Sequence, residues 1–284
     1  MKKLALLLSL LLASFSNGQT EKKSLLWKIS GNGLTKESYL FGTIHISCDA
    51  SLPKKVLTAL DKTEQLCLEL DMDDPNMQLE MMSKMMMRDG VTIQSLMSAE
   101  DFKLVDDFFK KQSGFSLKMM NTVKPFALSA MLYPKMLDCP MQSYETELMK
   151  VAKAQNEETI GLETFSEQLA VFDAIPYQTQ VNELIKTAKS DLDRDKKELQ
   201  EMLDLYKTED VEALIKYTEK SDNELTSGFM DELLNNRNSN WIERIEKIAK
   251  DKPTFFGVGA AHLGGQKGVI KLLQQKGYKV EAVF

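Results

Sequence analysis

Two apolar segments near opposite ends of the chain each lead into the same four-residue frame. The first frame runs from Gly42 to His45 (Gly-Thr-Ile-His), and the second runs from Gly259 to His262 (Gly-Ala-Ala-His). These frames contain the only two histidines of the 284-residue sequence. Over two hundred residues separate them, so only a fold that joins both ends of the chain in one core can bring the two imidazoles together.

The shared frame favours a functional site formed by His45 and His262. A glycine at a strand end lets a ligand approach the backbone closely, and the strand is a rigid support for the imidazole. Neutral imidazole is a ligand for zinc, manganese, cobalt or iron, and it is also a general base near neutral pH. The alternative for a lone histidine on a strand is a structural role.

The remaining pattern predicts an α/β fold: a central mixed sheet built from N- and C-terminal segments with a large inserted helical region. A hairpin is expected from strands 25–29 and 38–45 around a Gly-Asn-Gly turn. Further strands are expected at 65–70, 158–161, 254–258 and 278–283. Helices are expected at 53–62, 76–88, 99–111, 122–136, 144–154 and 266–276, and most of 163–250 has a helical pattern interrupted at 175–176 and 208–210.

The N-terminal residues have the pattern of a secretory signal peptide. Two lysines precede an apolar stretch at 4–15, and the small residues Ser16 and Gly18 predict cleavage before Gln19. We therefore expect a signal peptide at 1–18 and a single domain at 19–284, in which 19–75 and 251–284 form mainly the sheet core. Residues 76–250 would be mainly helical, with a core strand near 158–161.

These features predict an exported protein, periplasmic or extracellular, and the alternative is an uncleaved N-terminal anchor. No later segment has eighteen consecutive apolar residues, so no integral membrane segment is expected after signal removal. The formal net charge of −6 gives no basic surface for binding nucleic acid.

Three cysteines predict one disulfide and one free thiol in an oxidising compartment. Cys67 lies within an apolar strand, where a buried thiol is expected. Cys48 and Cys139 lie in loop-like segments, and they are the preferred pair.

Acidic and basic side chains at segment ends are further candidates for the site. Glu69 and Asp71 follow a buried-type strand and are two apart, so both would point to the same face. Glu69 is favoured as a ligand or a base, against the alternative of a polar strand exit. Glu163 follows a short strand, where it could join the site or, with Thr164, cap the next helix. Arg237 could bind a carboxylate or stabilise an oxyanion, or it could lie in a turn that joins two helices.

A dense methionine cluster follows the third strand. Exported methionine clusters can bind Cu(I), but methionine more often forms adaptable core or an apolar binding surface. The cluster comprises Met72, Met77, Met81, Met82, Met85, Met86 and Met87. Phosphate-binding glycine loops, Gly-x-Ser-x-Gly elbows, His-Glu-x-x-His helices and Cys-x-x-Cys pairs do not occur in the sequence.

Taken in order along the chain, these motifs resemble the TraB/GumN family, which includes the Tiki proteases and is distantly related to the erythromycin esterases. The resemblance covers essentially the whole chain after the signal peptide. It is carried by Tyr39-Leu40-Phe41-Gly42-Thr43-Ile44-His45, Leu68-Glu69-Leu70-Asp71, Gly161-Leu162-Glu163-Thr164 with Glu167-Gln168, Arg237-Asn238 with Trp241, and Gly257-Val258-Gly259-Ala260-Ala261-His262-Leu263.

The resemblance implies an α/β core with an inserted helical region, in which the two histidines and an acidic residue converge. It implies that His45 and His262 are metal ligands and that Glu69 or Glu163 is a ligand or general base. Arg237 would orient the substrate or stabilise developing negative charge. The metal would be a divalent ion: manganese, cobalt, zinc or iron.

The leading hypothesis is an exported metal-dependent hydrolase, with a peptide or another small molecule as substrate. Two imidazoles and one or two carboxylates leave coordination positions open, as a catalytic site requires. A second hypothesis is a metal-free hydrolase, esterase-like, with one histidine as base. A third is a non-catalytic protein that binds a peptide or a hydrophobic ligand.

Overall fold

A six-stranded mixed sheet forms the centre of the fold, in a computed structural model that describes residues 23–284. The predicted signal peptide at 1–18 lies outside the described residues. The strand order is β4-β3-β5-β2-β1-β6. Their bounds are β1 Leu26–Ser30, β2 Ser38–Thr43, β3 Gln65–Leu70, β4 Glu158–Glu163, β5 Thr254–Gly259 and β6 Lys279–Ala282. The predicted α/β fold, with its sheet built from both ends of the chain, is confirmed.

The predicted N-terminal hairpin is present. β1 and β2 pair antiparallel with Leu26 opposite Phe41, and every residue of β2 is buried. The second strand ends at Thr43, two residues earlier than expected, so His45 lies in the loop that follows it. β6 pairs with the other edge of β1.

Four neighbouring strands run parallel, and this determines where the site lies. β2 pairs with β5, β5 with β3, and β3 with β4, all in parallel register. Their carboxyl ends therefore meet at one edge of the sheet, which is where ligands bind in open α/β sheets. Thr43 lies opposite Gly259, and Leu70 lies opposite Glu163, so the four strand ends are level.

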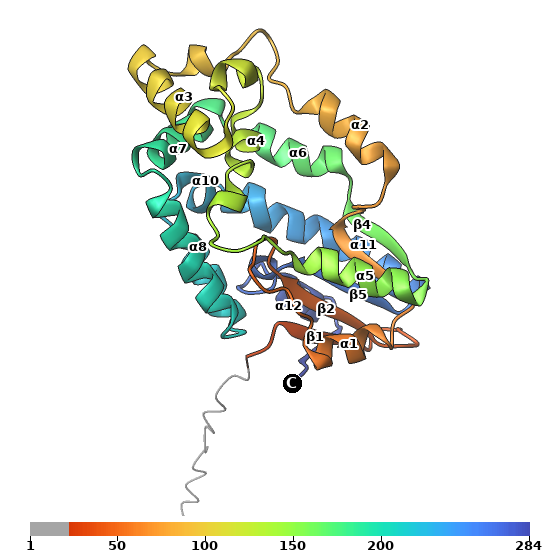
Figure 1. Cartoon of the computed structure of the whole chain (residues 1–284). Helices are drawn as coiled ribbons and strands as arrows, with labels where there is room; N and C mark the ends of the chain where they lie inside the picture. The colour runs from red at the N-terminus through yellow and green to blue at the C-terminus, as the bar shows by residue number, and fades with distance from the viewer. Residues whose placement is uncertain (1–22) are drawn as a thin grey trace, which may run out of the picture.

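Helices cover both faces of the sheet. In Figure 1, α5 lies in front of the sheet and α11 lies behind it. The helices are α1 Lys54–Leu60, α2 Pro75–Lys84, α3 Ala99–Ser113, α4 Pro125–Ala130, α5 Tyr144–Gln155, α6 Phe165–Ala174, α7 Tyr177–Lys189, α8 Asp193–Tyr206, α9 Val211–Glu219, α10 Glu224–Ser227, α11 Asn236–Asp251 and α12 Val269–Gln275. Within the described residues, no helix combines the length and the apolar character needed to cross a bilayer.

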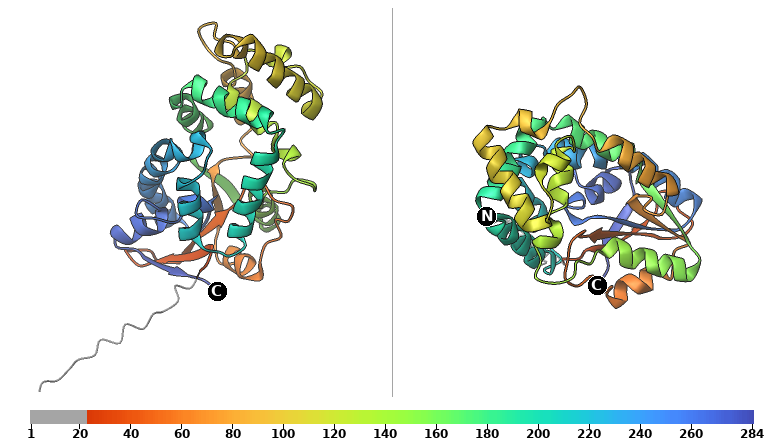
Figure 2. Two further views of the ribbon diagram at one scale, coloured as in Figure 1. Left: turned by 90° about the vertical axis from the view of Figure 1, so that its left-hand side faces the viewer. Right: turned by 45° about the horizontal axis from the view of Figure 1, so that its top comes forward.

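The inserted helices form a cover with its own hydrophobic core. This core is contributed mainly by α3, α4 and α7, and it includes Val105, Phe109, Leu128, Val181 and Leu184. In Figures 1 and 2 these helices lie away from the main body of the sheet, on the side where β4 leads into α6. The predicted mainly helical insertion is therefore present: part of it forms this second core, whereas α5, α8, α9 and α11 pack in the sheet core.

Two predicted helical features differ from the structure. The helix expected over 122–136 is divided into α4 and a short 3-10 helix, Tyr133–Lys135. Pro125 occupies the first turn of α4, and Pro134 cannot donate the backbone hydrogen bond that a continuous helix needs. Arg237 lies in the first turn of α11, directly after a π-helical turn, Asp231–Asn235, and not in a loop that joins two helices.

The cysteine predictions are confirmed. Cys48 and Cys139 form a disulfide, with their Cα atoms 5.6 Å apart. Cys67 is a buried free thiol in β3, where burial raises its pKa above the usual range. The methionines of the predicted cluster differ in environment: Met87 is buried in the core of the helical cover, whereas Met72, Met81 and Met86 are exposed.

Candidate functional site

His45 forms a close pair with Glu145. His45 lies in the loop after β2, and Glu145 belongs to the first turn of α5. The distance from Nδ1 of the imidazole to Oε1 of the carboxylate is 2.7 Å. The His45 side chain is 62% exposed and that of Glu145 is 9% exposed. Surrounding protein disfavours the charged imidazole, but the hydrogen bond and negative charge of Glu145 outweigh this and raise the pKa of His45 to about 9.

His262 lies in the 3-10 turn Ala260–His262 that directly follows β5, and it is buried. Its Nδ1 lies 2.6 Å from Oδ1 of Asn238. The Asn238 amide nitrogen donates to two backbone carbonyls, those of His262 and Lys267. Oδ1 is therefore the acceptor, and Nδ1 of the imidazole carries the proton. Burial lowers the pKa of His262 to about 3, so the ring is neutral at ordinary pH.

Glu69, next to the last residue of β3, connects the loop after β5 with Arg237. Its Oε1 accepts the backbone N–H of Gly259 at 2.8 Å and lies 3.7 Å from Nε2 of His262. Its Oε2 accepts from Arg237 Nη2 at 2.5 Å and from Gln168 Nε2 at 3.3 Å. Burial alone would raise its pKa, but the surrounding His262, Arg237 and His45 hold the pKa of Glu69 well below its usual range.

The Arg237 guanidinium lies at the centre of this network. Nε and Nη2 donate to Oε1 of Glu163 at 3.1 and 2.5 Å. Nη1 donates to the Leu233 carbonyl of the π-helical turn at 2.9 Å and lies 3.1 Å from Nε2 of His262. The guanidinium carbon lies 4.8 Å from the centre of the Trp241 ring, whose Nε1 donates to Glu163 at 3.1 Å.

Three of these groups converge on Gly259. A Cβ atom at this position would lie 3.3 Å from Oε1 of Glu69, 3.5 Å from Cδ2 of His262 and 3.7 Å from Nε2 of His45. The backbone of Gly259 has an ordinary φ of −51°. The glycine is therefore required for space and not for backbone conformation, because a side chain would fill the centre of the site.

The donor set and its charge match a divalent ion, but the donors are not assembled as a closed coordination site. Two imidazoles and a carboxylate are typical ligands of zinc, manganese and iron. The carboxylates of Glu69 and Glu163 contact the Arg237 guanidinium, and that of Glu145 contacts the imidazole of His45, so three carboxylates face two basic groups. Across residues 23–284, however, no three His, Cys, Asp or Glu side chains approach closely enough to form a metal-binding group.

The structure brings His45, His262, Glu69, Glu163 and Arg237 into one region, as the sequence predicted. Asp71 makes no contact with the two histidines: it lies one residue beyond β3 and, with Asp74, lines a groove of about 1030 Å³ beside β4 that Glu163 also lines. Partial burial, and to a smaller extent the neighbouring Asp73, raise the pKa of Asp71 to about 6.

Thr164 caps α6, as one alternative for this segment predicted. Its side chain accepts the Glu167 N–H, and Glu167 accepts the Thr164 N–H in return. Glu163 itself takes no part in this cap and contacts Arg237 and Trp241 instead.

Sequence reasoning missed Glu145 and the role of Asn238. Glu145 follows the helix-capping Ser143, where an acidic residue is expected simply to complement the helix dipole. Its burial is the distinguishing feature, and burial depends on tertiary packing. Asn238 stands next to Arg237 in a resemblance motif, but its hydrogen bond to His262 depends on how α11 packs against the loop after β5.

Comparison with known proteins identifies the family of this chain. The model of the TraB/PrgY/gumN family matches residues 25–282. The protein named "Metalloprotease TIKI2" from Danio rerio is 20% identical over an alignment of 319 residues, which covers 93% of this chain and 61% of the relative. The chain thus spans about three-fifths of that relative's length. No solved structure matches significantly. Because the family model covers nearly all of the described residues, the chain belongs to the TraB/PrgY/gumN family.

Proposed function

We propose that this chain is an exported, metal-dependent hydrolase of peptides, with its site at the carboxyl ends of β2, β3 and β5. One observation carries the proposal. Both histidines have Nδ1 engaged, by Glu145 and by Asn238, while Nε2 of His45 and Cδ2 of His262, the carbon bonded to its Nε2, face the space over Gly259. A metal-ligating histidine almost always has its second ring nitrogen bound to a carboxylate or an amide oxygen, which fixes the tautomer and the ring orientation.

In this proposal, the ion is held by Nε2 of His45, Nε2 of His262 and Oε1 of Glu69. Nη1 of Arg237 lies 3.1 Å from Nε2 of His262. Arg237 would therefore have to give up this hydrogen bond before an ion could bind the Nε2 lone pair. The arginine is an exchangeable partner, since it keeps its contacts with Glu69 and Glu163 through Nη2. A bound divalent ion supplies a Lewis acid for the scissile carbonyl and generates a nucleophile at neutral pH.

The remaining residues orient these groups and balance their charges. Glu145 orients the exposed imidazole of His45. Glu69 is a poor general base at neutral pH, because its pKa lies well below the usual range. Glu163 is 5% exposed and bonded to both Arg237 and Trp241, so we assign it the role of positioning the guanidinium. Arg237 is the nearest fixed positive charge for stabilising a developing oxyanion.

A metal-free hydrolase is the second candidate, and a specific contact favours it. Arg237 engages Nε2 of His262 directly, so His262 is occupied in the ligand-free arrangement. In that case the exposed His45, oriented by Glu145, is the general base, and it acts only in the fraction of molecules whose imidazole is neutral, which grows as the pH rises towards its pKa of about 9.

Peptide specificity and export have separate support. The Danio rerio relative is named a metalloprotease, which favours peptides as substrates of this chain. The N-terminal pattern is that of a secretory signal, and the Cys48–Cys139 disulfide suits an oxidising compartment. Both parts of the proposal can be tested independently of the site.

The test is the metal content and peptidase activity of the chain lacking residues 1–18, compared with His45→Ala and His262→Ala. Each protein is stripped with chelator, reloaded with manganese, cobalt, zinc or iron(II), and incubated with a random-sequence peptide library. Stoichiometric metal and cleavage in the wild type, both lost in folded variants, would support the proposal. Cleavage by the stripped wild type, insensitive to chelator, would establish the metal-free alternative. A folded protein that binds no ion and cleaves nothing would contradict both.

A further inference from the structure

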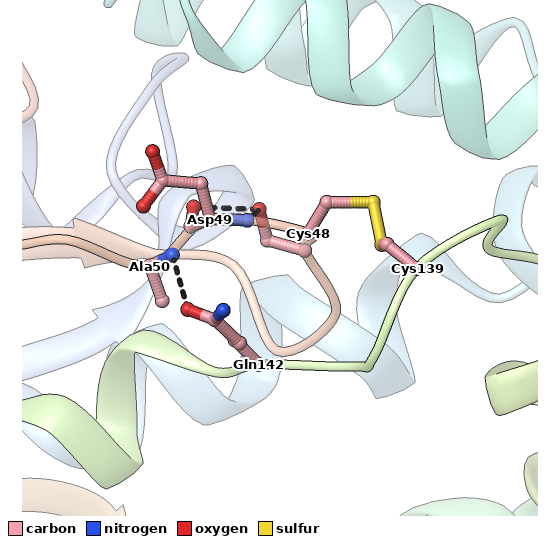
Figure 3. Close-up of a disulfide and its surroundings, with 6 residues drawn as sticks. Cys48, Asp49, Ala50, Cys139 and Gln142 are labelled. Atoms are coloured by element: carbon pink, nitrogen blue, oxygen red, sulfur yellow. Dashed lines mark hydrogen bonds between the residues drawn. A yellow bond between two sulfur atoms is a disulfide. The ribbon is translucent and has the colours of Figure 1, made fainter.

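A disulfide joins the loop that carries His45 to the segment that leads into α5, whose first turn carries Glu145. Cys48 follows His45 by three residues, and Cys139 precedes Glu145 by six. β2 ends at Thr43 and α1 begins only at Lys54, so no helix or strand contains His45. Figure 3 shows the sulfur–sulfur bond that bridges these two segments, which are distant in sequence.

Backbone hydrogen bonds reinforce the same junction. The Ser47 N–H donates to the Gln142 carbonyl at 2.9 Å, and the Gln142 N–H donates back to Ser47 at 2.8 Å. The Gln142 side-chain oxygen also accepts the Ala50 N–H at 3.2 Å, as Figure 3 shows. The Ser47–Gln142 bonds lie between the cysteines and the paired side chains along both segments, and the Ala50 bond lies on the other side of Cys48. The two loops are therefore fixed against each other within a few residues of the site.

Packing contributes little to the orientation of His45. Its side chain is 62% exposed, and within the described part of the chain its hydrogen-bond partner is Glu145. Glu145 itself is fixed, because it is buried in the first turn of α5, which packs on β3 and β4. The geometry of the pair thus depends on how closely the His45 loop is held to the start of α5.

We propose that Cys48 and Cys139 are positioning residues for the His45–Glu145 pair, so that the site is complete only in the oxidised chain. The consequence for activity depends on the hydrolase function proposed above. A displacement of about 1 Å in a catalytic group can reduce turnover by about 100-fold. A covalent bond between the two segments prevents such displacements, whereas the Ser47–Gln142 hydrogen bonds can open on the side of Gln142, which is exposed.

The disulfide is accessible to reductants, since Cys48 lies at the surface. A dithiol such as dithiothreitol transfers two electrons and two protons to the sulfur–sulfur bond. It becomes a cyclic disulfide, and Cys48 and Cys139 become thiols. In a reducing compartment the pair would therefore be loosened, and the enzyme would reach full activity only after export.

The experiment uses the fact that the sequence has two histidines. Labelling the chain with ¹⁵N-histidine gives two imidazole spin systems, one for His45 and one for His262. The metal-free wild type is compared with the same protein reduced by dithiothreitol and with the Cys48→Ser/Cys139→Ser double variant. In the oxidised protein, we expect a protected, hydrogen-bonded Nδ1 proton on His45.

Reduction or the double substitution should broaden or remove that His45 signal and leave the His262 signal unchanged. With the best-cleaved library peptide, kcat should fall by roughly 10- to 100-fold with KM nearly unchanged. Identical His45 signals in the oxidised and reduced proteins would overturn the proposal, whether or not the chain proves to be a hydrolase. Absence of all peptidase activity would contradict the proposed function alone, because the imidazole spectrum still reports on positioning.

General destabilisation is controlled for in two ways. The His262 signal reports whether the sheet core remains folded. If the double variant loses both signals it has unfolded, and the comparison is then made with the reduced wild type at low temperature. Asp106→Asn in α3 is the stability-matched control, because it destabilises the helical cover without touching either loop. Loss of the His45 signal in this control, with the disulfide intact, would also overturn the proposal.

Discussion

Arg237 and Glu163 form an ion pair with two donor nitrogens directly beside the histidine site. Nε of Arg237 donates to Oε1 of Glu163 at 3.1 Å, and Nη2 donates to the same oxygen at 2.5 Å. The two side chains are 11% and 5% exposed. A carboxylate that is bonded in this way cannot approach a substrate, so its contribution is the placement of the guanidinium between Glu69 and His262.

Glu163→Gln should therefore reduce both stability and turnover. The amide keeps the shape of the side chain but removes the charge opposite a buried guanidinium, which costs on the order of 3 kcal/mol of unfolding free energy. In the proposed hydrolase, a displaced Arg237 would stabilise an oxyanion less well, and removal of one such group typically lowers kcat by about 100-fold. Urea unfolding and steady-state kinetics measure the two effects.

Glu167→Gln is the matched control for this substitution. Glu167 pairs with Arg244, but both side chains are substantially exposed, at 45% and 39%. An exposed pair contributes only about 0–1 kcal/mol, and glutamine can still accept the Thr164 N–H in the helix cap. Equal losses in the two variants would mean that Glu163 has no special role.

Gly259→Ala tests the space between Glu69, His45 and His262. The backbone conformation suits alanine, so the free energy of unfolding should change by less than about 1 kcal/mol. The new methyl carbon would lie 3.3 Å from Oε1 of Glu69 and 3.7 Å from Nε2 of His45, where it displaces any ion or water bound by those atoms. We expect a folded protein whose metal affinity, measured by calorimetry, falls at least about tenfold. Unchanged affinity would exclude this position as the ion site.

Much of the site could be predicted because strands terminate at one edge. The apolar runs before Gly42 and Gly259 indicate strands, and parallel neighbours bring their carboxyl ends together. Glu69 and Glu163 follow from the same rule, since each ends a strand of the same parallel set. The disulfide could be inferred because only Cys67 lies in an apolar strand.

Glu145 could not be predicted, because its partner is a hundred residues away in sequence and belongs to a loop. Nothing in the local pattern distinguishes a helix-capping glutamate from one that is buried against an imidazole. The alternative of a helix-joining turn for Arg237 was wrong for a related reason. The Asn-rich segment around it has low helix propensity, but packing of Trp241 and Ile245 in the core stabilises α11 as a helix.

Asn238→Ala tests whether the tautomer of His262 matters. Asn238 accepts a hydrogen bond from the Nδ1 proton of His262. In the alanine variant the imidazole can rotate, or it can carry its proton on Nε2 instead. A protonated Nε2 binds neither a metal ion nor a proton from the substrate. Loss of such a supporting residue typically lowers metal affinity or activity by about 10- to 100-fold. Asn240→Ala, two residues later on the exposed side of α11, is the control and should behave like the wild type. A neutral Asn238→Ala variant would show that Arg237 alone orients the ring.

Asp106 links α3 to the segment that follows it. Protonation of Asp106 at low pH should lower the free energy of unfolding of the helical cover. Its carboxylate accepts from the Ser116 hydroxyl at 2.6 Å, the Leu117 N–H at 2.7 Å and Lys110 Nζ at 2.6 Å. Burial opposes the charge, but these hydrogen bonds lower the pKa of Asp106 to about 2. The folded state thus binds the proton less readily than the unfolded chain, where the pKa is near 3.8.

The stabilisation by Asp106 is therefore complete above about pH 4 and is lost as the pH falls towards 2. At pH 7, Asp106→Asn should lower the unfolding free energy by about 1–3 kcal/mol, as expected for a buried carboxylate that loses charged hydrogen bonds. Urea unfolding at pH 7, 4 and 3 should show the difference between wild type and variant shrinking only at the lowest pH. A difference that stays constant down to pH 3 and below would mean that the carboxylate is not titrating in this range. Peptidase activity at pH 7 should be unchanged, because α3 lies in the cover and not at the strand ends.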